Sequence, residues 1–377
     1  MRVVHIGKYY PPVLGGIETH LESLALGLHE HVDLRVLVAN TKRTTVTETP
    51  GGVNLVRLGR VAQIASAPLV RGLSEHLQEA KPDIVHLHHP NPFATITWLR
   101  NPVGKLVISY HGDTVRQRFL GRAFSPVLRA ALGRSSAVIA ATRNHVELSP
   151  VLSAFAERCH IVPYGIDLEH FAVADRAEVG TIGARFGDRL ILALGRLVYY
   201  KGFDVLLKAM RDVDGHLVLI GEGPLQQDLE RQIAELGLES KVTMLGAVGD
   251  IRPWYHAAAM FVLPSVARSE AFGIVQLEAM AARTPVINTA LPSGAPLVSI
   301  DGMTGLTVEP GDSEALAKAI GELLADRDLR ARMGAAGYER VRDGFTTERM
   351  VSGTLAVYGQ VLGTSSRKSA RKLNPDA

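Results

Sequence analysis

The chain has 377 residues, of which 46% are hydrophobic and 21% are charged, and its formal net charge is +3 at pH 7. These values describe a globular protein long enough for two domains, which excludes a disordered chain, and the weak positive charge does not indicate a nucleic-acid partner. One cysteine, Cys159, excludes a disulfide framework and is expected as a small core side chain. Because the first residues do not predict a signal peptide and no apolar run reaches the roughly 20 residues of a membrane span, we expect a cytoplasmic protein.

Short apolar runs alternate with helical patterns along the chain, which predicts an α/β fold with parallel sheets. The clearest helical patterns are Glu18–His29, Phe203–Met210, Leu225–Leu236 and Ser313–Leu324. The predicted strands form one set in each half of the chain: Val3–Ile6, Leu34–Val38, Val53–Arg57, Ile84–Leu87, Leu106–Tyr110, Ala137–Ala140 and His160–Val162, then Leu190–Ala193, Leu217–Ile220, Val242–Leu245, Met260–Leu263 and Pro285–Ile287.

The two sets of strands predict two domains of similar size. We expect an N-terminal domain over residues 1–170, a polar, glycine-containing linker over 171–187 and a C-terminal domain over 188–345. A further helical pattern covers 346–363, and the basic tail 364–377 has the composition of a disordered segment.

The first glycine-rich turn lies between the first predicted strand and the first helix, at Gly15-Gly16. Paired glycines let backbone N–H groups approach an anion, and a helix N-terminus favours negative charge. The pair is equally consistent with a turn that needs glycine only for its conformation.

Histidines follow the fourth and fifth predicted strands. His86 and His88 share a face of one strand, and His89 ends it, but no acidic or cysteine residues accompany them in the sequence, which favours cleft-lining histidines over a metal site. His111 ends the next strand, and Gly112 lets the backbone turn there.

The segment 112–143 carries six arginines and a single acid, interleaved with apolar residues. This pattern fits an amphipathic segment that meets an anionic membrane surface, with the contact running through Arg116–Arg134. An ordinary helix packed on a domain core explains the pattern equally well.

The C-terminal half offers cations and carboxylates after its strands. Arg196 and Lys201 lie in the loop after Leu190–Ala193, beside a predicted helix start, and suit a diphosphate. Glu270 and Glu278 follow the strand Met260–Leu263, with Glu270 in the loop and Glu278 about two turns into the following helix. The carboxyl ends of such strands are where doubly wound sheets bind ligands.

Two further strand-end turns have low specificity on their own. Gly221 and Gly223 are not a dinucleotide fingerprint, because Pro224 follows and the third glycine is absent. Ala247 lies in the turn after Val242–Leu245. We include all three residues among the candidates for donor binding.

Together these motifs resemble glycosyltransferase family 4 over about residues 2–360. The resemblance rests on Glu270…Glu278, on Gly195-Arg196…Lys201-Gly202, on Gly15-Gly16 and on the segment Val162–Asp167. It implies the GT-B fold, in which two Rossmann-like, doubly wound domains face each other across a cleft. The N-terminal domain would bind the acceptor, the C-terminal one the nucleotide-sugar donor, and a final helix would cross back to the first domain.

The resemblance also implies roles for individual residues. Arg196 and Lys201 match the cations that stabilise the leaving diphosphate, Glu270 the carboxylate at the donor sugar, Glu278 the one at the ribose, and His111 a histidine that reaches the donor sugar. The backbone N–H groups of Gly16 and of Ala271, Phe272, Gly273 and Ile274 would contact donor oxygens. Tyr164 departs from the family pattern, which often has Asn there, and this leaves the acceptor side open.

The implied activity is a retaining transfer of a hexosyl unit from a UDP- or GDP-linked sugar to a glycan or lipid-linked acceptor, without metal or other cofactor. Bacterial polysaccharide or glycolipid synthesis at the inner face of the plasma membrane would be the setting. We expect a same-face dissociative displacement, with Glu270 as a covalent nucleophile as the competing mechanism. A nucleotide-sugar epimerase or hydrolase on the same fold, and a non-catalytic sugar-binding protein, are the other functions considered.

Overall fold

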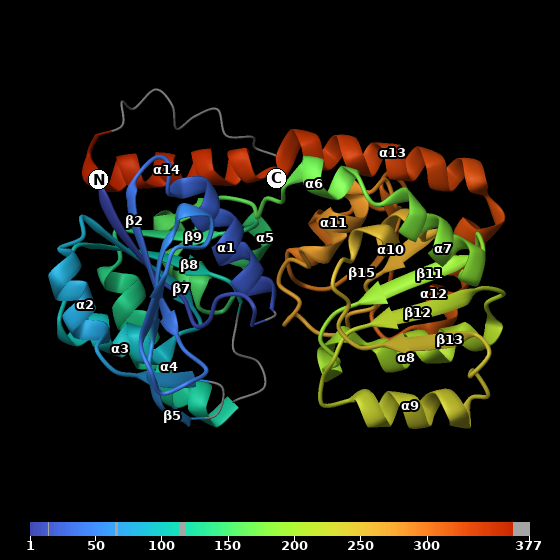
Figure 1. Ribbon diagram of the computed structural model, residues 1–377, viewed down its shortest axis with the longest axis horizontal. Helices are drawn as coiled ribbons and strands as arrows, with labels where there is room; N and C mark the ends of the chain where they lie inside the picture. Colours follow the sequence, from blue (N-terminus) through green and yellow to red (C-terminus); the bar gives the residue numbers. More distant parts are fainter. Residues whose placement is uncertain (14, 65–66, 113–117, 365–377) are drawn as a thin grey trace. The chain divides into compact units, whose positions relative to one another are not determined.

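The computed structural model describes residues 1–13, 15–64, 67–112 and 118–364, without the side chains of 118–122 (Figure 1). The chain forms two compact units: unit 1 contains Met1–Gly165 and Thr347–Ala377, and unit 2 contains Ile166–Thr346. Each unit is built around one parallel sheet.

The sheet of unit 1 has the strand order β10-β9-β8-β7-β1-β2-β4-β3, and every pair is parallel except β3 with β4. The chain adds strands outward from β1 in one direction and then from β7 in the other, so its direction of winding reverses between β1 and β7. Its strands are β1 (Arg2–Ile6), β2 (Asp33–Ala39), β3 (Val46–Glu48), β4 (Asn54–Leu58), β7 (Ile84–His89), β8 (Lys105–Tyr110), β9 (Ala137–Ala140) and β10 (Cys159–Ile161). A separate antiparallel hairpin joins β5 (Arg60–Ile64) and β6 (Ala67–Val70).

Helices cover both faces of this sheet because successive strand residues point to opposite sides. Val3 packs in the cluster that contains α1 (Gly16–Leu28) and α14 (Thr347–Leu362), whereas Val4 packs in the cluster on the other face. The helices of that second face are α2 (Leu73–Ala80), α3 (Pro92–Arg100), α4 (Arg118–Arg134) and α5 (Arg143–Leu148). Helix α14 therefore brings the end of the described chain back onto unit 1, beside α1 (Figure 1).

The sheet of unit 2 is entirely parallel, with the order β13-β12-β11-β14-β15-β16. Its winding reverses between β11 and β14. Its strands are β11 (Leu190–Leu194), β12 (His216–Ile220), β13 (Val242–Leu245), β14 (Met260–Val262), β15 (Val286–Thr289) and β16 (Gly305–Val308). The helices of the unit are α6 (Leu168–Ala172), α7 (Arg176–Phe186), α8 (Phe203–Ala209), α9 (Gln226–Glu235), α10 (Arg252–Ala257), α11 (Val275–Ala281), α12 (Ser313–Ala325) and α13 (Arg327–Gly344).

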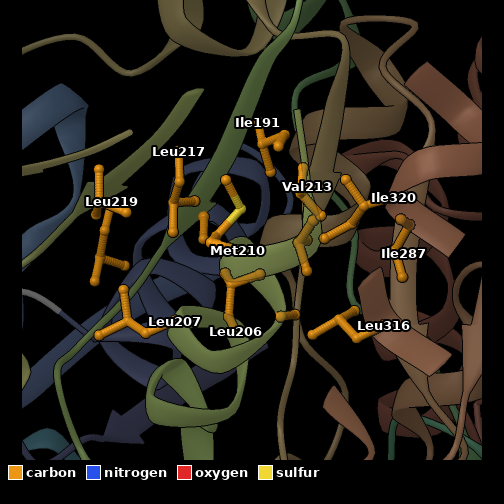
Figure 2. Close-up of a cluster of buried hydrophobic side chains, with 14 of the residues drawn as sticks. Ile191, Leu206, Leu207, Met210, Val213, Leu217, Leu219, Ile287, Leu316 and Ile320 are labelled. Atoms are coloured by element: carbon orange, nitrogen blue, oxygen red, sulfur yellow. The ribbon is translucent and has the colours of Figure 1, made fainter. Parts of the chain in front are cut away.

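The core of unit 2 lies between its sheet and the helices α8, α9 and α12. Figure 2 shows Leu206, Leu207 and Met210 directed toward strand residues such as Ile191 and Leu217, with Leu316 and Ile320 of α12 in the same cluster. These side chains are between 0% and 1% exposed, so the loops that follow the strands of this sheet are anchored to a closely packed core.

The predicted linker over 171–187 is wrong, because most of it is a helix of unit 2. The side chain of Asp175 accepts hydrogen bonds from the backbone N–H groups at the start of α7. Ile182 is buried, and Phe186 contacts Trp254 of α10 with ring centroids 5.9 Å apart. Gly180 and Gly183, two of the glycines that suggested a linker, lie within α7, where an added Cβ would meet no described atom within 4 Å. The boundary between the two units lies between Gly165 and Ile166, whereas the predicted first domain ends at residue 170.

Candidate functional site

The two loops that carry the predicted catalytic residues of unit 2 lie side by side where the winding of its sheet reverses. Strands β11 and β14 are hydrogen-bonded neighbours, and residues 195–202 follow the first while 264–274 follow the second. The Val266 N–H donates to the Tyr200 carbonyl oxygen at 2.8 Å, which ties the loops together. Ligands of doubly wound sheets bind outside the carboxyl ends of the strands at such a point.

Lys201 and Glu270 form a buried ion pair across these loops. The Lys201 Nζ lies 2.7 Å from the Glu270 Oε2, and their side chains are only 10% and 9% exposed. The Ser265 hydroxyl donates to the same carboxylate oxygen at 3.0 Å. Burial opposes the charge of Lys201, but the negative charge of Glu270 and its hydrogen bond, with further help from Tyr200 and Glu278, raise the pKa of the ammonium. A cation and a carboxylate are thus held in place together before any ligand binds.

Glu278 lies one helical turn into α11 and is buried. The Tyr255 hydroxyl donates to its Oε2 at 2.8 Å. Burial raises the pKa of the Glu278 carboxyl, while Tyr255 and the charge of Lys201 partly offset this effect. The ion pair of Lys201 with Glu270 and the electrostatic influence of Lys201 on Glu278 place three of the four predicted charged residues of this unit in one neighbourhood.

The expected position of Glu278 two turns into its helix is wrong by one turn. Helix α11 begins at Val275, because Gly273 has a φ of +74° and residues 271–274 form the turn before it. Phe272 and Ile274 are 2% and 8% exposed and belong to the core, so at these two positions only the backbone is available to a ligand. Part of that backbone is already used, since the Gly294 N–H donates to the Ala271 carbonyl oxygen at 3.0 Å.

Gly195, Gly221 and Gly223 bring two strand-end loops into backbone contact. A Cβ at Gly221 would lie 2.1 Å from the Gly195 carbonyl oxygen, and one at Gly223 would lie 2.4 Å from the Leu197 carbonyl oxygen. This packing accounts for the glycines without any ligand. Arg196 and Ala247 are exposed at the same edge of the sheet.

The glycine turn of unit 1 follows β1, at the reversal point of its own sheet. Gly15 precedes the first residue of α1, which is Gly16, and its carbonyl oxygen accepts from the Thr19 N–H at 2.9 Å. The Arg57 guanidinium donates to the carbonyl oxygens of Tyr10 and Pro11 at 3.2 and 2.5 Å, which holds the loop before the glycines.

The histidines of unit 1 form one buried cluster that the sequence only partly indicated. His86 and His88 do share a face of β7, and β1 brings His5 directly opposite His86. His20 of α1 and His111 join them, and all five are at most 6% exposed. Both ring nitrogens of His111 are hydrogen-bonded. Its Nε2 lies 2.9 Å from His88 Nδ1, and its Nδ1 contacts the Tyr164 hydroxyl.

The cluster contains two groups whose ring nitrogens converge within 4.8 Å: His5, His86 and His88, and His20, His88 and His111. The members of each group come from distant parts of the sequence, so the spacing of His86, His88 and His89 alone does not predict these groups. His89 belongs to neither group.

The arginine-rich segment is described only in part. Arg116 falls outside the described residues. In the described part of α4, Leu128 and Leu132 are buried in the core, whereas Arg129 and Arg134 are exposed. Within the described chain, no helix has the length and apolar character needed to span a membrane.

Comparison with known proteins matches both halves of the chain. The family model described as "Glycosyltransferase Family 4" matches residues 14–170, and the one described as "Glycosyl transferases group 1" matches residues 180–340. The O-antigen chain mannosyltransferase C of Escherichia coli is 28% identical over 97% of this chain and 100% of its own length. The D-rhamnosyltransferase WbpZ of Pseudomonas aeruginosa is 32% identical over 92% of each chain.

The fold has a counterpart among solved structures. HepE of Anabaena, in complex with UDP and glucose, superposes with a TM-score of 0.79 at 19% identity, over 96% of this chain and 100% of its own.

Proposed function

Because the chain belongs to glycosyltransferase family 4, and so is a glycosyltransferase of GT-B fold, we propose that it moves a hexosyl unit, with retention, from a UDP- or GDP-linked sugar to a glycan or lipid-linked acceptor. The mannosyltransferase and rhamnosyltransferase relatives support a hexosyl or deoxyhexosyl donor and a role in bacterial surface polysaccharide or glycolipid synthesis. The observation that carries this proposal is the buried Lys201–Glu270 pair at the reversal point of the unit 2 sheet.

Lys201 supplies the charge that the departing diphosphate requires. As the glycosidic bond breaks, negative charge grows on the diphosphate, and a fixed buried cation stabilises that charge more strongly than one in water. The raised pKa keeps Lys201 protonated throughout the neutral range. Arg196, exposed at the same sheet edge, adds a second cation with a bidentate donor geometry. Two cations in this position allow departure without a divalent metal.

The carboxylates hold the donor by its hydroxyl groups. Glu270, fixed by Lys201 and Ser265, accepts from the sugar, and Glu278, fixed by Tyr255, accepts from the ribose. Backbone N–H groups of 271–274 and of Gly16 complete the contacts. The acceptor hydroxyl attacks the face that the diphosphate leaves and passes its proton to the departing phosphate oxygen.

His111 meets the donor sugar at the ring nitrogen now paired with Tyr164. A sugar hydroxyl can replace the tyrosine hydroxyl at His111 Nδ1, because both groups donate and accept one hydrogen bond.

A panel of UDP- and GDP-sugars, read by thermal shift and then by product formation, tests the function. A ligand that binds only the folded state raises Tm. We expect one donor to raise Tm and to yield a glycoside whose anomeric configuration matches the donor. Release of free sugar without acceptor as fast as transfer with it would indicate a hydrolase, and no Tm change with any donor would contradict the proposal.

The exposed arginines of α4 provide the contact with an anionic membrane surface that carries a lipid-linked acceptor. The apolar residues Leu128 and Leu132 of α4 are buried in the core of unit 1, so the attraction to the membrane is electrostatic. Wild-type protein should sediment with vesicles containing anionic phospholipid and not with neutral ones. Arg129→Glu should weaken this binding and Arg332→Glu, at an exposed arginine of α13, should not; equal binding by both variants would refute the contact.

A further inference from the structure

The buried histidines of unit 1 are joined into one continuous chain of hydrogen bonds. The Ser109 hydroxyl lies 2.7 Å from His86 Nε2, and the Tyr358 hydroxyl bridges His86 Nδ1 at 2.5 Å and His5 Nε2 at 2.8 Å. His5 Nδ1 lies 3.1 Å from His88 Nε2, and His88 Nδ1 lies 2.9 Å from His111 Nε2. His111 Nδ1 in turn lies within hydrogen-bonding distance of the Tyr164 hydroxyl.

The four imidazoles of this chain are neutral at physiological pH. Burial lowers the pKa of His5 to about 3, with a smaller effect from His20. Burial, and then the neighbouring histidines, hold the pKa values of His86, His88 and His111 well below the usual 6.5. A neutral imidazole has one N–H donor and one acceptor nitrogen.

This chemistry couples every member of the chain to the next. Each of the four histidines uses both ring nitrogens in the chain, so each must donate at one link and accept at the other. The Tyr358 hydroxyl likewise donates to one histidine and accepts from the other. If both histidines donated to the Tyr358 oxygen, its own proton would have no acceptor among the described residues. Only two arrangements therefore satisfy every link and also give the Tyr358 O–H an acceptor: either every histidine carries its proton on Nδ1, or every one carries it on Nε2.

We propose that His5, His86, His88 and His111 share one tautomer, and that Tyr358 of α14 is a positioning residue that extends this order through to His111. The inference about His111 rests on its proposed contact with the donor sugar. A mismatch at any link would leave two buried N–H groups or two buried lone pairs facing each other, which costs as much as an unsatisfied buried hydrogen bond. Helix α14, which carries Tyr358, thus completes the hydrogen-bond network that orients His111.

The arrangement is incompatible with a metal at either group of converging nitrogens. A metal ion would take the ring lone pair that accepts the hydrogen bond from the next member. Zinc retained stoichiometrically by the purified protein would therefore overturn the proposal.

Nitrogen-15 NMR of histidine-labelled full-length protein tests the coupling directly, because the two ring nitrogens of each tautomer have distinct shifts. At pH 7 we expect all four imidazoles to be neutral and to have the same tautomer. Different tautomers among the four, or a charged imidazole, would overturn the proposal.

Two variants test the bridge. In Tyr358→Phe the link between His86 and His5 is lost, so the ring signals of His86 should separate from those of the other three. Ser109→Ala removes only the terminal hydrogen bond of the series, at His86 Nε2, and should leave all four histidines with one common tautomer. Tyr10→Phe is the matched control, since the Tyr10 hydroxyl is buried but has no hydrogen-bond partner within the described residues. Unchanged His86 signals in Tyr358→Phe, or equal changes in Tyr10→Phe, would refute the role of Tyr358.

Activity provides a separate readout for His111. Tyr358→Phe should lower kcat by about tenfold, the scale of one hydrogen bond, with the donor KM changed less than twofold. An unaltered kcat would refute the positioning role while leaving the tautomer result standing. A wild-type protein that transfers no sugar would count against the proposed function instead, since the NMR measurement does not depend on turnover.

Discussion

Lys201 contributes both to the stability of unit 2 and to the proposed chemistry, and the two contributions can be measured separately. Lys201→Ala removes a charge at the leaving group and should lower kcat by about 100-fold or more. It also leaves Glu270 buried without its cation, which should cost about 3–5 kcal/mol of unfolding free energy. Denaturant unfolding and initial rates measure these effects.

A second variant and a control separate them. Lys201→Met with Glu270→Gln should regain most of the lost stability but none of the activity, because the buried charge is gone and the cation is still missing. Lys208→Ala, at an exposed lysine of α8, should change neither. Near-wild-type turnover in Lys201→Ala would remove the basis of the mechanism.

In its proposed contact with the ribose, Glu278 should make donor binding sensitive to acid. Burial raises its pKa above the usual 4.5, so on acidification the carboxyl takes up its proton earlier than an exposed glutamate and then accepts hydroxyl groups less well. The donor KM should therefore rise as the pH falls, beginning above pH 4.5. Glu278→Gln should bind donor weakly at every pH in this range. A donor KM that stays constant in wild type down to pH 4.5 would contradict the ribose role.

The sequence spacing identified Lys201, Glu270 and Glu278 individually, but not the ion pair between the first two. Whether the loops of residues 201 and 270 meet depends on β14 pairing with β11 rather than with β13, which precedes it in the chain. Local patterns carry no information on that order. The same holds for the histidines: His5 meets His86 only because β1 lies beside β7.

Gly334 allows α13 to pack closely against the segment that follows α11, the helix that carries Glu278. A Cβ at Gly334 would lie 2.0 Å from the Arg283 carbonyl oxygen, just after α11, and backbone cannot move aside as a side chain can. Gly334→Ala should therefore destabilise unit 2 by about 1–3 kcal/mol. Thermal or denaturant unfolding measures this change.

Gly321→Ala is the matched control for this helix contact. Gly321 lies within α12, and an added Cβ would meet no described atom within 4 Å. Alanine there should stabilise the protein by up to about 1 kcal/mol, because it favours helix. If both alanines shifted stability in the same direction, the contact between α13 and the segment after α11 would not be the constraint that we describe.

At the scale of elements, the strongly apolar strands of both sheets were predicted to within a few residues, and α7 and α13 were not. The buried face of α13 includes Gly334 and Gly337 beside Met333 and Val341, so it lacks the apolar stripe by which a helix is recognised. Helix α7 has a single buried apolar residue, Ile182, and two glycines, which imitate a linker. Strand β16 is only partly buried and was also missed.

At the scale of the whole molecule, the buried histidines should make unit 1 less stable to acid than unit 2. A histidine whose folded pKa lies below its unfolded value of about 6.5 contributes stability that is present above pH 6.5 and is lost as the pH falls toward the folded pKa. His5 and His20, each with a pKa near 3, and His86, His88 and His111 all act in this direction. Below pH 6, each should contribute on the order of 1 kcal/mol of destabilisation per pH unit.

The two tryptophans allow this prediction to be checked unit by unit. Trp98 lies in α3 of unit 1 and Trp254 in α10 of unit 2. In Trp254→Phe the fluorescence reports unit 1, and its urea midpoint should fall steeply between pH 6.5 and 5. In Trp98→Phe the midpoint should fall much less. Equal pH dependence of the two midpoints would contradict the prediction.

We propose that cations of the protein, Lys201 foremost, replace a metal ion at the departing diphosphate. The most direct test is the transfer rate in excess EDTA, measured for wild type and Lys201→Ala with the donor that the panel identifies. We predict a wild-type rate within twofold of that without chelator, and a rate about 100-fold lower or more in the variant. Loss of wild-type transfer in EDTA that added Mg²⁺ or Mn²⁺ restores would contradict the account.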